Sequence, residues 1–121
     1  MRIFTGYFSR IKLYEKDGLV PISISRYKPK WFEGEECVAL APSANLLYRY
    51  KNGQASVADY TEEYNAMLDS MDVKNIIENA AKGRDIVLCC YEKPGDFCHR
   101  NLVAKHCNEK YGMEIKEKVV G

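Results

Sequence analysis

The chain has 121 residues, of which 46% are hydrophobic and 29% charged, a composition that excludes a disordered or fibrous protein. Its formal net charge is +1, which excludes a strong electrostatic field of the whole protein that would attract nucleic acid. The length predicts a single domain over residues 1–121, and no apolar run reaches the roughly 20 residues of a membrane helix. The five cysteines, an odd number with Cys89 and Cys90 adjacent, argue against a secreted disulfide framework, so we expect a cytoplasmic protein with reduced thiols that does not bind membranes.

The first quarter of the chain predicts two strands separated by a polar connection. Residues 2–9 are rich in Ile, Phe and Tyr, which favour strands, and the predicted strand ends near residues 6–9. Residues 10–18 are mostly polar and end in an Asp-Gly turn signal, so they predict a connecting segment. Residues 19–25 (LVPISIS) predict the second strand.

The middle of the chain predicts one short strand and then three helices. The strand is expected over residues 37–40 (CVAL). Good N-cap residues precede segments in which apolar side chains recur at helical spacing. The predicted helices cover residues 45–50, a segment that begins at Ser56 or Asp59, and a segment that begins at Asp72.

The last third of the chain predicts a strand, a helix and a final strand. Residues 86–90 (IVLCC) are apolar throughout, which indicates a strand covered on both faces. Asp96 is a good N-cap for a helix over 97–110, and residues 113–120 alternate as a strand does. Strands separated by helices predict a compact α/β domain, with a mainly parallel sheet of about four to five strands and helices on both faces.

The turn between strand 86–90 and the helix that follows it carries the candidate site. Ligands of open α/β sheets bind beyond the carboxyl ends of the strands, and a helix N-terminus favours an anion. The thiol of Cys98 lies beside Arg100 in the first helical turn, a setting that favours the thiolate. Cys98 could therefore act as a nucleophile, with His99 as its base and Arg100 holding a carboxylate or phosphate.

Simpler interpretations of the same residues stay open. Cys89 lies in a covered strand, where cysteine usually serves as a small hydrophobic residue. Cys98 is as compatible with packing as with chemistry. Arg100 could equally form a structural ion pair with Glu92 or Asp96 across the turn.

The cysteines and histidines in this part of the chain raise the question of a metal site. They are Cys89, Cys90, Cys98, His99, His106 and Cys107. No Cys-x-x-Cys or His-x3-His pair is present, and adjacent residues on a strand point to opposite faces. The sequence therefore predicts no metal and no other cofactor, and it favours a core or surface role for His106.

Separate blocks of the sequence resemble one family. Cys90-Tyr91-Glu92, a short turn and then Cys98-His99-Arg100 look like the signature of the domain-of-unknown-function 488 family. IFTGYFSR (3–10) is similar to that family's opening strand, and SRYKP (25–29) to the segment after its second strand. The resemblance implies a compact α/β fold and supplies no reaction. It also implies one pocket formed by Cys90, Glu92, Cys98, His99 and Arg100, together with Arg26 and Tyr7.

Two classes of function fit these residues. The first is an enzyme, a hydrolase or transferase, that acts on a phosphate-bearing substrate such as a nucleotide or a nucleic-acid end. The residues assigned to it are Cys98, His99 and Glu92 for catalysis, and Arg100, Arg26, Arg10 and Tyr7 for substrate binding. The alternative is a non-catalytic module that holds a nucleotide-like anion, for which the positive helix end and the arginines suffice.

The aromatic middle third of the chain supports a further binding hypothesis. Its aromatic residues are Tyr48, Tyr50, Tyr60, Tyr64 and Trp31, interleaved with Arg49 and Lys51. Such a composition suits stacking on single-stranded nucleic acid. Packing of the same tyrosines within a helix pair is the favoured explanation.

Overall fold

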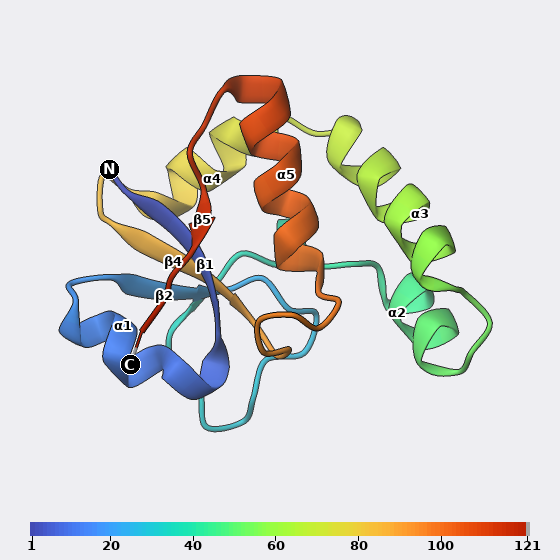
Figure 1. The fold of residues 1–121 in the computed structure, drawn as a ribbon, viewed down its shortest axis with the longest axis horizontal. Coiled ribbons are helices and arrows are strands. Elements are labelled where there is room, and N and C mark those ends of the chain that lie inside the picture. Colours follow the sequence, from blue (N-terminus) through green and yellow to red (C-terminus); the bar gives the residue numbers. More distant parts are fainter. Residues whose placement is uncertain (121) are drawn as a thin grey trace.

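The computed structural model of the chain describes residues 1–120, which form a five-stranded sheet with helices on both faces (Figure 1). The strands are β1 (Ile3–Tyr7), β2 (Val20–Ser23), β3 (Glu35–Glu36), β4 (Ile86–Cys90) and β5 (Lys116–Glu117). All paired strands run parallel, in the order β3-β2-β4-β1-β5. The predicted α/β class and its parallel sheet are confirmed.

The helices divide between the two faces of the sheet. They are α1 (Ile11–Lys16), α2 (Ala44–Lys51), α3 (Val57–Asp69), α4 (Val73–Ala81) and α5 (His99–Tyr111), with 3₁₀ turns η1 (Phe8–Arg10) and η2 (Val38–Leu40). α1 contributes to a smaller core on one face, and α2 to α5 contribute to a larger core on the other. Within residues 1–120, no helix is long and apolar enough to cross a membrane.

The central strand β4 is buried along its whole length, as its apolar sequence predicts. Its side chains alternate between the two cores: Ile86 and Leu88 join the larger core, and Val87 and Cys89 join the smaller one. Burial raises the pKa of the Cys89 thiol to about 12, so this cysteine is an inert packing residue. The same alternation turns Cys90, the last residue of β4, toward α5.

Local capping sets the helix starts that the sequence predicted. Ser56 is the N-cap of α3, and Asp59 is its partner in a capping box rather than a competing start. The Ser56 backbone N–H donates to Asp59 Oδ2 at 3.0 Å, and the Asp59 N–H donates to Ser56 Oγ at 3.0 Å. Asp72 caps α4 by accepting from the Asn75 N–H at 3.3 Å.

The polar connection predicted over residues 10–18 is instead mostly the short helix α1. Its two buried residues, Ile11 and Tyr14, lie three positions apart and so share one face. The Tyr14 ring packs against Gly6 of β1, where a Cβ atom would come within 2.6 Å of the ring. Tyr14 Oη also accepts a hydrogen bond from the Tyr7 N–H at 3.1 Å. Contacts with the sheet therefore stabilise a helix too short to be evident in sequence.

Two predicted strands also differ from the structure. Residues 37–40 form η2, and the short strand lies just before them at β3. The Cys37 N–H donates to Ser23 O at 2.7 Å, and tight turns through residues 38–41 then lead the chain away from the sheet. The strand predicted over 113–120 pairs only at Lys116 and Glu117, beside Phe4 and Thr5 of β1.

Candidate functional site

The strand-to-helix corner runs from the end of β4 through residues 91–97 into α5. The N-cap of α5 is Cys98, so the predicted cap at Asp96 and helix start at 97 are wrong. The Asp96 N–H donates to Lys93 O at 3.2 Å, and Gly95 adopts a φ of 95°, which together form a tight turn. The chain takes the helical direction only after Cys98, whose backbone is extended. Asp96 therefore lies outside the helix.

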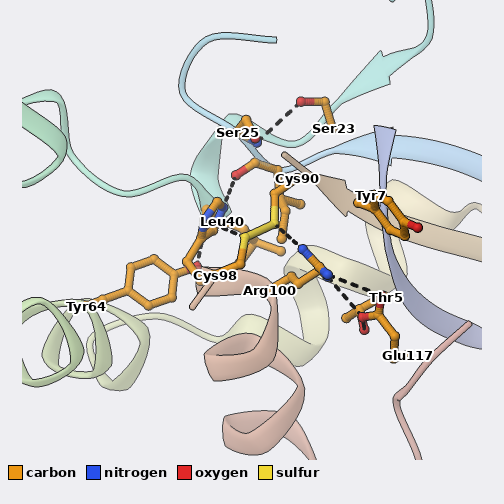
Figure 2. The surroundings of a disulfide bond; sticks show 12 residues. Thr5, Tyr7, Ser23, Ser25, Leu40, Tyr64, Cys90, Cys98, Arg100 and Glu117 are labelled. Atoms are coloured by element: carbon orange, nitrogen blue, oxygen red, sulfur yellow. Dashed lines mark hydrogen bonds and ion pairs between the residues drawn. A yellow bond between two sulfur atoms is a disulfide. The ribbon is translucent and has the colours of Figure 1, made fainter. Parts of the chain in front are cut away.

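A disulfide joins Cys90 to Cys98 across this corner (Figure 2). The expectation of reduced thiols is therefore wrong for these two residues. The physical reason is the tight turn, which brings the end of β4 and the start of α5 back to the same side of the sheet. In the described chain, the remaining cysteines, Cys37, Cys89 and Cys107, are free and buried.

His99 is held in a single orientation beneath the disulfide. Its Nε2 lies 2.6 Å from the Ile24 carbonyl oxygen, an acceptor, so Nε2 carries the proton and donates. Its Nδ1 therefore has a lone pair, and it lies 3.9 Å from Cys98 Sγ. Burial lowers the pKa of His99 to about 4; the hydrogen bond to Ile24 opposes this shift, and the nearby charge of Arg100 adds to it. The imidazole is thus neutral near pH 7.

We expect this buried neutral imidazole to make stability depend on pH. The ordinary His pKa of about 6.5 applies to the unfolded chain, whereas the folded value is about 4. As pH falls through this window, the unfolded state gains a proton that the folded state does not. The free energy of unfolding should therefore drop by about 2 kcal/mol between pH 7 and pH 5. Urea unfolding at several pH values measures this slope.

His99→Gln is the comparison that isolates the slope, because Gln keeps a donor for Ile24 O and does not titrate. The carboxyls of Asp59, Asp85 and Glu35 have pKa values held below their ordinary range, chiefly by hydrogen bonds, so they titrate below this window. Equal slopes for the wild-type and variant proteins between pH 7 and pH 5 would contradict a buried neutral His99.

Arg100 lies under the corner and is fully buried. Its Nε and Nη2 donate to the Glu117 carboxylate at 2.9 and 3.2 Å, and its Nη1 donates to Cys90 Sγ at 3.1 Å (Figure 2). The Tyr7 ring centroid lies 5.9 Å from the guanidinium carbon. The structural ion pair considered from sequence is therefore present, with Glu117 as the partner in place of Glu92 or Asp96.

The corner opens into a cavity of about 470 Å³, which we call the corner pocket. The residues predicted to form a site that do line it are Arg26, Cys90, Glu92, Cys98 and His99, whereas the buried Arg100 does not. It lies beyond the carboxyl ends of the adjacent strands β2 and β4, where ligands of α/β sheets are expected. Tyr91 Oη donates to Tyr27 O at 2.5 Å and so ties together the two segments that follow these strands.

Sequence reasoning did not place several residues of the corner pocket at this corner, although it had considered Tyr50, Tyr60 and Lys51 for a separate nucleic-acid surface. Tyr50, Tyr60 and Phe97 form an aromatic cluster on its wall, with ring centroids 5.1 to 5.6 Å apart. Lys51 adds a second cationic side chain, besides that of Arg26, to the lining of the pocket. Ser25 also lines the pocket, and within residues 1–120 its buried Oγ has no hydrogen-bond partner. The sequence signals for Ser25 were its place next to Arg26 and its inclusion in the SRYKP block (25–29) that resembles the family.

Arg10 and Tyr7 do not reach the corner pocket in the described part of the chain. Arg10 Nε donates to Tyr7 Oη at 3.1 Å, and Arg10 lines a separate hollow beside α1 together with Trp31 and Phe32. The predicted convergence of Arg10, Arg26 and Arg100 is therefore not observed. The reason is that β1 is separated from β2 by β4, so the segments after β1 and β2 lie apart.

The tyrosine-rich segment mainly packs the larger core. Tyr60 and Tyr64 are buried, and Tyr64 Oη donates to Leu40 O at 2.5 Å. These two rings are therefore not free to stack on nucleic acid, although Tyr48 and Trp31 are exposed. His106 Nδ1 lies 3.5 Å from Asp69 Oδ1, which places it between α5 and the end of α3 and away from the corner pocket.

A protein-family model described as DUF488-N3a, "Active DUF488-N3 subclade", matches residues 11–111 of the chain. This match covers most of the sequence and confirms the family resemblance that the sequence predicted. No curated protein and no solved structure matches the chain.

Proposed function

The chain belongs to the DUF488-N3a family, the active DUF488-N3 subclade, and on this premise we propose that its corner pocket binds a nucleotide-like anion and acts on it as a hydrolase or transferase. The observation that carries the proposal is the shared lining of the pocket, in which an aromatic cluster adjoins two cationic side chains. A planar base requires the first feature and a phosphate requires the second.

Each part of such a ligand has a complementary group in the corner pocket. Tyr50 and Phe97 offer ring faces and edges, while Arg26 and Lys51 offer positive charge. Arg26 Nε donates to Pro42 O at 3.0 Å, a hydrogen bond that helps to fix the orientation of the guanidinium. The unpartnered Ser25 Oγ supports a ligand that supplies the missing hydrogen bond. A volume of about 470 Å³ falls within the range of small-molecule sites.

The residues proposed for catalysis all line the corner pocket. Glu92 lies in the turn after β4 and is exposed, so its carboxylate can exchange protons with a ligand and with water. Cys98 and His99 lie at the helix start, where a reduced Cys98 would have the His99 lone pair within 3.9 Å. This set of a thiol, an imidazole and a carboxylate supports acid–base or nucleophilic chemistry.

The disulfide favours binding without turnover as a second candidate. In the disulfide-bonded chain the Cys98 sulfur is bonded to Cys90 and so cannot act as a nucleophile. The aromatic cluster and the two cations do not depend on that sulfur. Binding of a single-stranded nucleic-acid end to the same pocket, and a cytoplasmic location, stay predictions.

Arg26→Ala tests the binding proposal. With adenosine monophosphate and inorganic phosphate as probes, we expect the wild-type melting temperature to rise with probe concentration. Loss of one charge-assisted contact should weaken binding by at least about tenfold. Arg10→Ala is the matched control and should bind as the wild type does, because Arg10 lies outside the corner pocket. Absence of stabilisation by either probe, or an equal loss in both variants, would contradict the proposal.

A further inference from the structure

Cys90, Cys98 and His99 place two sulfurs and a ring nitrogen within 4.8 Å of one another, and all three residues are buried. We propose that the reduced protein binds a zinc ion through Cys90 Sγ, Cys98 Sγ and His99 Nδ1. This inference goes beyond the proposed function, because it assigns a metal site to the wall of the corner pocket. It gives Cys98 the role of a ligand in place of a nucleophile.

The donor atoms are those that zinc prefers. Two thiolates and one neutral imidazole make a Cys₂His set, which leaves a fourth coordination position. Because all three residues line the corner pocket, that position faces the ligand site. The Nδ1 lone pair of His99 is directed by the hydrogen bond from Nε2 to Ile24 O at 2.6 Å, the outer contact that metal-bound histidines usually make.

The buried charges also balance when zinc is present. Arg100 and Glu117 form a neutral pair beneath the site, at 2.9 Å between Nε and Oε1. Two thiolates above them would leave an uncompensated charge of minus two in a buried place, and a divalent cation cancels it. Arg100 Nη1, which lies 3.1 Å from Cys90 Sγ, would then donate to a metal-bound thiolate.

The backbone spacing suits two ligands of one ion. The Cα atoms of Cys90 and Cys98 lie 7.3 Å apart, beyond the range of about 4.4–6.8 Å usual for disulfides. In a tetrahedral site with zinc–sulfur bonds of about 2.3 Å, the two sulfurs lie about 3.8 Å apart. The cysteine side chains can separate to that distance by rotating, without bringing the strand and the helix closer.

The spacing of these residues in the sequence did not indicate a metal site. Cys90 and Cys98 are eight residues apart, so no Cys-x-x-Cys pair marks them. The corner turn brings them together, and the extended backbone of Cys98 allows its side chain and that of His99, its neighbour, to approach each other. The relevant strand neighbours, Cys89 and Cys90, do point to opposite faces, and only Cys90 takes part.

Reduction must precede metal binding. A water-soluble phosphine donates two electrons to the disulfide, and one water molecule supplies the oxygen of the resulting phosphine oxide and the two protons that convert the sulfurs to thiols. Zinc then displaces both thiol protons to solvent as it binds. Zinc and the disulfide are therefore mutually exclusive states of the same two cysteines.

The test is a titration of the phosphine-reduced, desalted chain with Zn²⁺ and, in parallel, with Co²⁺ under argon. We expect uptake of a single ion per chain, with thiolate-to-cobalt charge-transfer absorption and the visible bands of a four-coordinate ion. Bound zinc should slow alkylation of Cys90 and Cys98 by iodoacetamide, as read by peptide mass spectrometry. Cys98→Ser should lose the charge-transfer absorption of the pair, whereas Cys89→Ala should keep it, because Cys89 faces the opposite core.

The oxidised wild-type chain gives a second comparison that needs no variant. It has the same sequence and should take up no zinc at this site. Failure of the reduced chain to bind either ion, or equal binding by the oxidised and reduced chains, overturns the proposal. Arg26→Ala separates the two proposals. The reduced variant should bind zinc as the wild type does, whether it has lost probe binding or the wild-type chain also fails to bind the nucleotide probes.

Discussion

Glu117→Ala is expected to lower the free energy of unfolding by about 3 kcal/mol, because it leaves the Arg100 charge buried and unpaired. Arg100 is fully buried, and the Glu117 carboxylate accepts two of its N–H groups. Thr5 Oγ1 donates to the same carboxylate at 2.8 Å. The Glu117→Ala substitution therefore removes the ion pair and also the side-chain hydrogen bond between β5 and β1. These two strands otherwise pair at only two positions.

Urea unfolding at neutral pH measures this loss. Glu114→Ala is the matched control, since Glu114 lies on the same segment and is exposed, and it should stay within about 0.5 kcal/mol of the wild type. Replacing both Arg100 and Glu117 by Met should recover part of the loss, because no charge is then left buried. A loss below about 1 kcal/mol for Glu117→Ala would mean that water reaches Arg100 in solution.

Glu92→Gln is expected to lower turnover about a hundredfold while leaving probe affinity nearly unchanged. The reason is that the amide keeps the shape of the side chain but cannot transfer a proton, and positioned acid–base groups contribute on the order of a hundredfold or more. Glu92 lines the corner pocket together with Cys98 and His99. Release of inorganic phosphate or of nitrophenol from a panel of nucleoside phosphates and nitrophenyl phosphate esters measures turnover.

Glu109→Gln is the control for this experiment, since Glu109 is an exposed residue of α5 and does not line the corner pocket. It should match the wild type in turnover and in probe affinity. If the wild-type chain binds the probes and turns over none of the panel, the non-catalytic binding module is favoured. If Glu92→Gln turns over substrate at the wild-type rate, Glu92 is not the acid–base group.

The two proposals for the corner share residues but make different demands on them. Ligand binding, as proposed, depends on Arg26, Lys51 and the aromatic cluster, and it does not require reduced cysteines. The zinc proposal depends on Cys90, Cys98 and His99 in the reduced state. Because the three metal ligands line the same pocket, the fourth coordination position of a bound zinc ion would be open to the anion. Stronger probe binding in the zinc-loaded protein would link the two.

The amino-acid sequence by itself determined the fold class, and it predicted a candidate site at the corner after β4. The apolar run in β4 predicts a strand covered on both faces, because it contains no strongly polar side chain suited to a solvent-exposed face. The capping signals at Ser56 and Asp72 act over three residues, so they can be read locally. The family resemblance also depends on short local blocks, and the family match over 11–111 agrees with it.

Only the tertiary structure decided which side chains meet. Arg100 pairs with Glu117, seventeen residues away, because β5 joins the sheet beside β1. Ser25 lines the corner pocket because it follows β2, which lies next to β4. Arg10 follows β1, on the other side of β4, and lies outside the pocket. Cys90 meets Cys98 through the shape of a turn. Local patterns encode backbone conformation and burial, whereas the partners of a polar side chain depend on strand order, which arises when distant segments pack together.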